Sequence, residues 1–302
     1  MGKKIDKKKI LVLGATGMLG IMVLYHIQTN KKLKVNGTIR TKIKESSKLI
    51  NFSVEKFIAH PEKYSFIKEY DYIINCIGII KPFCQDNNAS GVKKAIIVNS
   101  LFPHALADFL VGTNVKVIQI ATDCVFDGTV GNYKEISIHN PNDVYGKTKS
   151  LGEVESENFL HIRCSIIGPK TKENLLEWFL AQKPKSHING FAHHRWNGVT
   201  TLQFTKLCEQ IIIKDYFNKL LSKSNIHHFT PNATVTKYEL LISMNKIFKK
   251  NLIIKKVDDI GPSVDRTLAT QYNILPKMIP ETTIENALIE LQEYMNTHNM
   301  DY

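Results

Sequence analysis

The stretch ILVLGATGMLG at residues 10–20 decides the fold that this chain is expected to adopt. Its first four residues are all apolar, which is typical of a strand buried on both faces. Gly14, Gly17 and Gly20 follow directly. Such glycines form a tight turn, let the backbone approach a pyrophosphate, and let a helix pack closely on the strand. Although the spacing is G-x-x-G-x-x-G rather than G-x-G-x-x-G, the strand–turn–helix context predicts a dinucleotide-binding loop.

Short apolar runs and longer amphipathic stretches alternate through the first half of the chain. Further strands are expected at residues 33–39, 54–59, 72–77, 115–120 and 160–167, and helices at residues 18–28, 95–110 and 144–157. Continuous apolar strands separated by helices predict a parallel sheet covered on both faces, which is a Rossmann-type doubly wound α/β fold.

The rhythm loosens after Gly168, where the chain turns polar over residues 186–201. Helices are expected at residues 175–181, 202–213, 237–248 and 283–295, and strands at 226–229 and 252–257. We therefore predict a Rossmann domain over residues 1–168, rejoined by about residues 199–229. A smaller C-terminal α/β substrate-binding domain is predicted over residues 169–198 and 230–302.

Composition and charge exclude several classes of protein. The 302 residues are 43% hydrophobic and 23% charged, which excludes a largely disordered chain, a collagen-like repeat and a coiled coil. The formal net charge of +12 raises the question of nucleic acid. However, the lysines are scattered, and their one dense cluster lies in the tail at residues 3–9. We expect a solvated surface that mildly attracts anionic ligands, and no nucleic-acid binding.

Cysteine usage and the N-terminus bear on localisation. The five cysteines are widely spaced, and no C-x-x-C occurs, so neither a zinc ribbon nor a dithiol motif is expected. A reducing compartment, the cytoplasm, follows. The basic start and the apolar residues 10–25 imitate a signal peptide, but no cleavage site follows and glycines interrupt the run. Without about 18 uninterrupted apolar residues, no membrane span is expected.

The second expected strand ends at Arg40, which bears on the choice of cofactor. An NAD site usually carries Asp or Glu about 20 residues beyond the glycines, where the carboxylate binds the ribose hydroxyls. No acid stands there, and a guanidinium suits a 2′-phosphate. Arg40 at this position favours NADPH, with NADH as the alternative. The simpler explanation of Arg40 is that it is only an exposed residue at the end of a strand.

Tyr145 and Lys149 share one face of an expected helix because they are four residues apart. An ammonium near a phenol favours the phenolate, and such a pair suits proton transfer to or from a carbonyl oxygen. Thr122 follows the fifth strand, at the edge where parallel strands form a ligand crevice, so its hydroxyl could share a hydrogen bond with a substrate oxygen. Asp123 and Asp127 fit an acid/base pair and turn caps equally well.

These residues together carry a resemblance to a known family. The glycine motif, the hydroxyl residue after the fifth strand, and Tyr-x-x-x-Lys occur in the order found in extended short-chain dehydrogenase/reductases. More narrowly, four segments resemble the dTDP-4-dehydrorhamnose reductase group: ATDCVFDG at 121–128, YGKTKSLGE at 145–153, RCSIIG at 163–168 and WNGVTT at 196–201. Nearly the whole chain takes part in this resemblance.

The resemblance implies roles for individual residues. The catalytic triad would be Thr122, Tyr145 and Lys149. The cofactor-binding residues would be Gly14, Thr16, Gly17, Met18, Leu19, Gly20, Arg40, Asn75, Ile77, Gly78 and Asn99, together with Tyr145 and Lys149. The substrate-binding residues would be Asp123, Cys124, Phe126, Trp196, Asn197 and Val199.

The sequence departs from the pattern of the group in two respects. The group usually has S-T-D-Y-V-F-D-G, and Cys124 replaces its tyrosine, which opens the choice of substrate. The metal site that some members have at a dimer interface has no counterpart that we can locate, so no metal is expected. The adjacent His193 and His194 diverge and lack a third ligand, so a solvated loop is the better interpretation.

The sequence thus predicts an NADPH-dependent reductase of a nucleotide-linked 4-keto-6-deoxyhexose. The sugar is the dTDP-linked 4-dehydrorhamnose or a UDP-linked, N-acetylated analogue. One alternative is an epimerase or dehydratase of the same superfamily. Another is a non-catalytic subunit similar to the regulatory subunit of methionine adenosyltransferase. The nucleotide-sugar is the expected partner, and the oligomeric state is left open, with a homodimer as one alternative.

Overall fold

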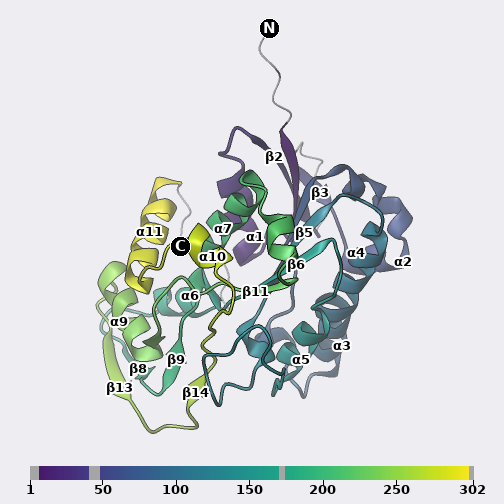
Figure 1. Ribbon diagram of the computed structural model, residues 1–302. Coiled ribbons are helices and arrows are strands. Elements are labelled where there is room, and N and C mark those ends of the chain that lie inside the picture. Colours follow the sequence, from purple (N-terminus) through teal and green to yellow (C-terminus); the bar gives the residue numbers. More distant parts are fainter. Residues whose placement is uncertain (1–6, 41–47, 170–173, 299–302) are drawn as a thin grey trace. The chain divides into compact units, whose positions relative to one another are not determined.

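The computed structural model describes residues 7–40, 48–169 and 174–298, and Figure 1 shows the course of the chain. The chain forms two compact units, each built from three separate segments. Unit 1 comprises Met1–Ala121, Pro141–Ile162 and Thr205–Ile226. Unit 2 comprises Thr122–Asn140, Arg163–Phe204 and His227–Tyr302.

A seven-stranded sheet with the order β11-β6-β5-β4-β1-β2-β3 is formed mainly by unit 1, and Arg163 of β6 and His227 and His228 of β11 belong to unit 2 (Figure 1). Its strands are β1 (Lys8–Leu13), β2 (Leu33–Ile39), β3 (Leu49–Asn51), β4 (Tyr72–Asn75), β5 (Lys116–Ala121), β6 (Phe159–Arg163) and β11 (Ile226–His228). The pairs β3–β2, β2–β1, β1–β4 and β4–β5 are all parallel. This sheet, with its flanking helices, confirms the predicted Rossmann-type α/β fold.

Helices cover both faces of the sheet (Figure 1). They are α1 (Met18–Ile27), α2 (Val54–Ala59), α3 (Ala89–Ala95), α4 (Phe102–Leu110), α5 (Val144–Leu151), α7 (Thr201–Ile213) and α8 (Phe217–Leu221), with the 3₁₀ segments η1 (Pro61–Glu69) and η2 (Lys81–Phe83) and the π-helix η3 (Ile96–Leu101). Leu11 and Leu13 of β1 pack in one apolar cluster with Phe57 and Phe102. Because side chains alternate along a strand, the equally buried Ile10 and Val12 face the opposite layer.

The strand predicted at residues 54–59 is wrong, because this segment is helix α2. Ser53 caps the helix by accepting a hydrogen bond from the Lys56 N–H. Val54 and Phe57, three residues apart, lie on one helical face and are buried. The third strand is instead Leu49–Asn51, directly before the cap. A short apolar run fits a strand and a buried helix equally well, and here the cap decides.

Helix α5 is shorter than the predicted helix at residues 144–157, since it ends at Leu151. Gly152 follows as its C-cap and donates to the Thr148 and Lys149 carbonyl oxygens. A Cβ at Gly152 would lie 1.8 Å from the Asn99 carbonyl oxygen. Glycine is therefore required here, because the end of α5 touches the backbone of η3.

Unit 2 is made of small sheets and helices. Its described strands are β7 (Ile166–Ile167), β8 (His187–Phe191), β9 (His194–Trp196), β10 (Val199–Thr200), β12 (Val235–Thr236), β13 (Ile253–Val257) and β14 (Val264–Asp265). Its helices are α6 (Leu175–Leu180), α9 (Lys237–Ile247), α10 (Ile274–Met278) and α11 (Ile284–Thr297), with the 3₁₀ turn η4 (Asp123–Val125). The predicted strand at 160–167 is divided into β6 and β7, and the polar stretch at 186–201 contains three strands.

A buried arginine organises the interior of unit 2. Arg163 is 1% exposed, and its guanidinium donates to His228 Nε2 at 3.1 Å and to His139 Nε2 at 2.6 Å. Because arginine only donates, the Nε2 atom of each imidazole accepts these hydrogen bonds. Burial raises the pKa of Glu135, but hydrogen bonds from Thr270 and from backbone amides outweigh it, so this pKa lies below its ordinary value.

No helix in the described part of the chain is long and apolar enough to cross a membrane.

Candidate active site

The glycine loop of unit 1 joins the end of β1 to the start of α1. Gly14 has a φ of +76°, a conformation that favours glycine. A Cβ at Gly20 would lie 2.1 Å from the Gly14 carbonyl oxygen, so only glycine lets the first turn of α1 lie this close to the loop. Gly17 precedes α1, and no side chain caps this helix. The uncapped N–H groups and the closely approachable backbone fit the phosphates of a dinucleotide.

The other predicted loop residues differ in how far they reach the surface. Thr16 is exposed and Met18 is half-buried, whereas Leu19 is buried. The loop is braced from β2, because the Gly14 N–H donates to Thr38 Oγ1 at 3.0 Å. Backbone and glycine, rather than long side chains, therefore form the part of the loop that a ligand would meet.

The turn after β4 packs against this loop. Asn75 is 1% exposed, and its amide donates to Gln119 Oε1 at 2.7 Å while its oxygen accepts from the Ile77 N–H at 3.1 Å. A Cβ at Gly14 would lie 2.9 Å from Ile77 Cγ1, so the turn and the glycine loop are in contact. Gly78 is exposed. Asn75 thus shapes the turn from inside, while Ile77 and Gly78 form its accessible part.

Arg40 lies directly after β2 and is exposed. The pKa of Glu55 lies below its ordinary value, chiefly because hydrogen bonds from the backbone and from Ser53 stabilise the carboxylate, with a smaller contribution from the charge of Arg40. Arg40 therefore has a nearby acidic group on α2. The segment that follows it, residues 41–47, lies outside the described part of the chain.

Helix α5 positions the predicted proton-transfer pair. Asp143 caps the helix by accepting from the Gly146 N–H at 2.8 Å. Lys149 is 7% exposed, and its ammonium donates to the Ile120 carbonyl oxygen of β5 at 2.8 Å. Tyr145 lies one turn earlier on the same helix and is half-buried. The lysine is therefore fixed at the carboxyl end of β5, which is the end that carries ligands in parallel sheets.

Asn99, in the π-helix η3, connects three parts of unit 1. It is 2% exposed, accepts from the Ile79 N–H at 2.8 Å and donates to the Ile79 carbonyl oxygen at 2.9 Å. It also donates to Thr148 Oγ1 at 3.1 Å, next to Lys149. Asn99 therefore ties the chain after β4 to the helix that carries the lysine.

In unit 2, Thr122 begins the segment that follows β5. Its hydroxyl donates to Asp123 Oδ1 at 3.1 Å and accepts from the Cys124 N–H at 3.2 Å. Thr122 and Asp123 are 5% and 8% exposed, respectively. The only proton of the threonine hydroxyl is thus directed at Asp123.

Asp127 caps a turn. Its carboxylate accepts from Tyr133 Oη at 2.6 Å and from the Thr129 N–H at 3.0 Å. The pKa of Asp127 lies below its ordinary value, chiefly because of the Tyr133 hydrogen bond. The sequence fitted an acid/base pair and turn caps equally well. In the structure, Asp127 stabilises a turn, whereas Asp123 accepts the hydroxyl proton of Thr122.

Three of the predicted substrate-binding residues are bound into the structure of unit 2. Phe126 is fully buried and stacks on Tyr133, with ring centroids 4.3 Å apart. Val199 is fully buried in β10. Asn197 uses both ends of its amide on the backbone of Leu268, at 2.7 and 3.1 Å. Contact of these three residues with a substrate stays a prediction.

Trp196 and Lys237 form a group that sequence analysis did not foresee. Trp196 donates through Nε1 to Ser165 Oγ at 2.7 Å, which fixes the indole. The Lys237 ammonium lies over this ring, 4.8 Å from its centroid. It is also close enough to Asp123 and Cys124 for their charges to raise its pKa. A lysine on an amphipathic helix looks like a surface residue in the sequence, and its neighbours come from distant segments.

His193 and His194 both bond to backbone carbonyl oxygens. His193 reaches Val257 and Ile260, and His194 reaches Pro262 at 3.2 Å. His194 belongs to β9 rather than to a loop. Within residues 7–40, 48–169 and 174–298, no group of three or more His, Cys, Asp and Glu side chains could hold a metal ion.

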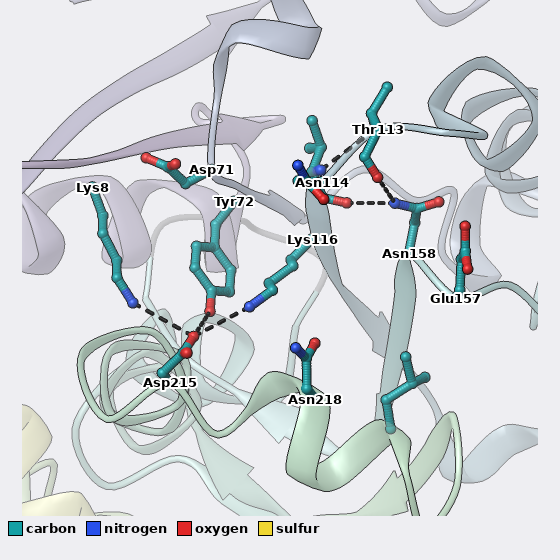
Figure 2. Close-up of a pocket in the computed structure, with 12 residues that line it drawn as sticks. Lys8, Asp71, Tyr72, Thr113, Asn114, Lys116, Glu157, Asn158, Asp215 and Asn218 are labelled. Atoms are coloured by element: carbon teal, nitrogen blue, oxygen red, sulfur yellow. Dashed lines mark hydrogen bonds and ion pairs between the residues drawn. The ribbon is translucent and has the colours of Figure 1, made fainter.

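A pocket of about 650 Å³ opens at the amino-terminal ends of the strands of the unit 1 sheet, opposite the ends that carry the glycine loop. Lys8, Tyr72 and Lys116 begin β1, β4 and β5, and Figure 2 shows them converging on Asp215. The Asp215 carboxylate accepts from Lys116 at 3.2 Å and from Tyr72 Oη at 3.1 Å, and lies 3.6 Å from the Lys8 ammonium. The Lys116 hydrogen bond is the main reason why the pKa of Asp215 is lowered. These charges are paired, so we assign this edge a structural role.

The fold and the residues of unit 1 define a class of protein first. A Rossmann-type sheet, a glycine loop after β1, and Tyr-x-x-x-Lys on α5 are the features of extended short-chain dehydrogenase/reductases. Residues 8–260 match the family described as the RmlD substrate binding domain, and the chain belongs to this family. The resemblance that the motifs indicated is confirmed.

Individual relatives carry two different names. The chain is 25% identical over 255 residues to dTDP-4-dehydrorhamnose reductase of Aggregatibacter actinomycetemcomitans, covering 78% of this chain and 83% of that protein. It is also 25% identical over 255 residues to methionine adenosyltransferase 2 subunit beta of Xenopus laevis, covering 81% and 73%. The crystal structure of dTDP-4-dehydrorhamnose reductase from Bacillus anthracis in complex with NADP has a TM-score of 0.72 at 15% identity, covering 95% and 99%. At that identity the structure supports the fold alone.

Proposed function

We propose that this protein is an NADPH-dependent reductase of the 4-keto group of a nucleotide-linked 4-keto-6-deoxyhexose, either dTDP-4-dehydrorhamnose or a UDP-linked, N-acetylated analogue. The observation that carries this proposal is the buried Lys149, four residues after Tyr145 and hydrogen-bonded at 2.8 Å to the carboxyl end of β5. The glycine loop in the same unit and the family support it. So does the similarity to dTDP-4-dehydrorhamnose reductase of Aggregatibacter actinomycetemcomitans.

In this proposal the residues of the chain divide the work. The N–H groups at the start of α1 would hold the diphosphate of NADPH, which supplies the hydride for the sugar carbon. Tyr145 donates a proton to the alkoxide oxygen that results. The Lys149 ammonium stabilises the negative charge that the phenol acquires. Thr122 donates a hydrogen bond to the carbonyl oxygen. For this, the Thr122 hydroxyl must turn its proton from Asp123 to the substrate.

Arg40 supports NADPH over NADH in this proposal. It is exposed directly after β2, so its guanidinium is accessible to a 2′-phosphate. The nearby Glu55 offers it a weaker competing partner, because Glu55 is held chiefly by its own hydrogen bonds.

The test is oxidation of NADPH, followed by absorbance, against a panel of dTDP- and UDP-linked 4-keto-6-deoxy sugars. We expect turnover with at least one sugar, and Tyr145→Phe should lower kcat by ~10²–10⁴-fold with little change in NADPH affinity. The lost hydroxyl removes the proton donor while the ring remains. A Tyr145→Phe enzyme that keeps more than about half of its kcat would remove Tyr145 from the mechanism.

A second candidate is a non-catalytic binding subunit, favoured by the similarity to methionine adenosyltransferase 2 subunit beta. Fold and family do not by themselves settle an activity. The two candidates make opposite forecasts. A binding subunit copurifies with a larger synthetase and turns over no sugar of the panel, whereas the reductase turns over without any partner.

A further inference from the structure

We propose that Lys237 is a substrate-binding residue whose ammonium donates hydrogen bonds to oxygen atoms of the sugar. This inference rests on the proposed function and deepens it. It concerns unit 2 alone, where Lys237 is the first residue of α9 and lies over the indole of Trp196.

The ammonium of Lys237 has no hydrogen-bond acceptor within the described ranges. The ammonium lies 4.8 Å from the ring centroid of Trp196, and the charge of Asp123 acts on it at longer range. Lys237 is half-buried, and its ammonium has three N–H donors that a ligand can reach. By contrast, Lys246 on the same helix pairs with Glu285 at 2.6 Å on the surface. In the described part of the chain, no protein acceptor competes with a ligand for the donors of Lys237.

The position of Lys237 is unfavourable for a cation because of the helix dipole, nearby basic side chains and burial. It occupies the start of α9, where the helix dipole repels positive charge. His194 also lies close enough for Lys237 and Arg266 to help lower its pKa, behind the larger effects of burial and of His193. Burial lowers the pKa of Lys237 itself to about 8, although Asp123 and Cys124 act in the opposite direction. Oxygen atoms of a ligand that accept hydrogen bonds from Lys237 would offset these unfavourable effects on its cation.

The neighbours of Lys237 indicate the sugar as that ligand. Asp123 accepts the hydroxyl proton of Thr122, the residue proposed to bind the reacting carbonyl. Lys237 is therefore near the group that is proposed to bind the sugar. The indole of Trp196 is 4% exposed and is fixed by its hydrogen bond to Ser165, so it positions the Lys237 ammonium that lies over it. A sugar with hydroxyl or carbonyl oxygen atoms facing Lys237 is favoured, and one with a charged amino group there is rejected.

The binding test compares Lys237→Met with Lys246→Met as the matched control. Isothermal titration with NADP⁺ present would use dTDP-glucose, UDP-glucose, dTDP and UDP as probes. We expect Lys237→Met to weaken the nucleotide-sugars ~10–100-fold and the bare nucleotides less than about 3-fold, as loss of hydrogen bonds from a charged donor implies. Lys246→Met should change neither. Lys237→Arg should recover part of the affinity, because it keeps the charge in a different geometry.

Other outcomes overturn the inference in distinguishable ways. Equal weakening of nucleotides and nucleotide-sugars would place Lys237 at the phosphates, and no weakening, or no binding of any probe by the parent, would remove its role. If Lys237 had only a structural role, Lys237→Met would lower the urea concentration at the unfolding midpoint. We expect this midpoint to be unchanged or higher. The reductase proposal is decided separately by NADPH oxidation. Turnover with an unchanged sugar KM in Lys237→Met refutes only the lysine's role, and sugar-specific binding without turnover refutes only the reductase.

Discussion

Replacing Asn99 by alanine should destabilise unit 1 by about 3 kcal/mol. The change deletes the hydrogen bonds at 2.8 and 2.9 Å to the backbone of Ile79 and the one at 3.1 Å to Thr148. Each lost hydrogen bond is worth about 0.5–1.5 kcal/mol, and leaving a buried partner unpaired costs about 1–3 kcal/mol. Ile79 is half-buried, so its two groups fall at the low end, about 1 kcal/mol each, and the buried Thr148 bond adds a similar amount.

Urea unfolding followed by far-UV circular dichroism measures this loss. Both tryptophans, Trp178 and Trp196, lie in unit 2, so their fluorescence reports on the unit that the substitution leaves intact. Asn88→Ala is the matched control, because it removes a single cap hydrogen bond at the start of α3. A cap of this kind is worth about 1 kcal/mol.

Catalysis gives a second readout for the same variant. Thr148 precedes Lys149, so Asn99→Ala should also lower kcat, whereas Asn88→Ala should leave it unchanged. If Asn99→Ala were no less stable than Asn88→Ala, the three bonds would not be acting as the link between η3, the chain after β4 and α5.

Three further substitutions probe the cofactor loop, the cofactor preference and acid stability. Gly20→Ala should abolish soluble expression or NADPH binding, since its Cβ would lie 2.1 Å from a backbone oxygen; normal binding would contradict the loop geometry. Arg40→Ala should reduce the preference for NADPH, chiefly through KM; equal kcat/KM for both cofactors in the parent would contradict its role. The His26 hydrogen bond is the main reason why the pKa of Glu209 is lowered. This pair therefore stabilises the fold above the ordinary carboxyl pKa and is lost as pH falls, so the stability gap between the parent and Glu209→Gln should shrink in acid.

The parallel sheet was predictable because its central strands are continuous apolar runs. Such runs are typical of strands that are buried on both faces of a sheet. Residues 54–59 misled the prediction because six residues with a few apolar positions do not define a period, and the deciding signal was the polar Ser53 before them. Of the strands of unit 2, β13 was predicted at residues 252–257, whereas β8, β9, β10, β12 and β14 were missed for a similar reason. They are two to five residues long, and partners distant in the chain, rather than their own pattern, specify them.

The candidate site divides in the same way. Tyr145, Lys149 and the glycines were found because their spacing in the sequence reflects a single turn or helix. Lys237 was missed because its environment is assembled from Asp123, Trp196 and the start of α9, more than 110 residues apart at the extremes. Catalytic and ligand-binding roles within these sets stay predictions until the variants are measured.

The interleaving of the two units has a consequence for biosynthesis. Unit 1 is completed by Thr205–Ile226, which leaves the ribosome after two of the three segments of unit 2, and unit 2 is completed by His227–Tyr302, which follows all of unit 1. The first 121 residues emerge with five strands of the sheet, and β6 and β11 join that edge only later. The growing chain therefore exposes the edge of β5 while it is translated, which makes this edge the place where a nascent-chain chaperone would be needed. For the same reason, neither unit can be expressed as an uninterrupted fragment of the gene.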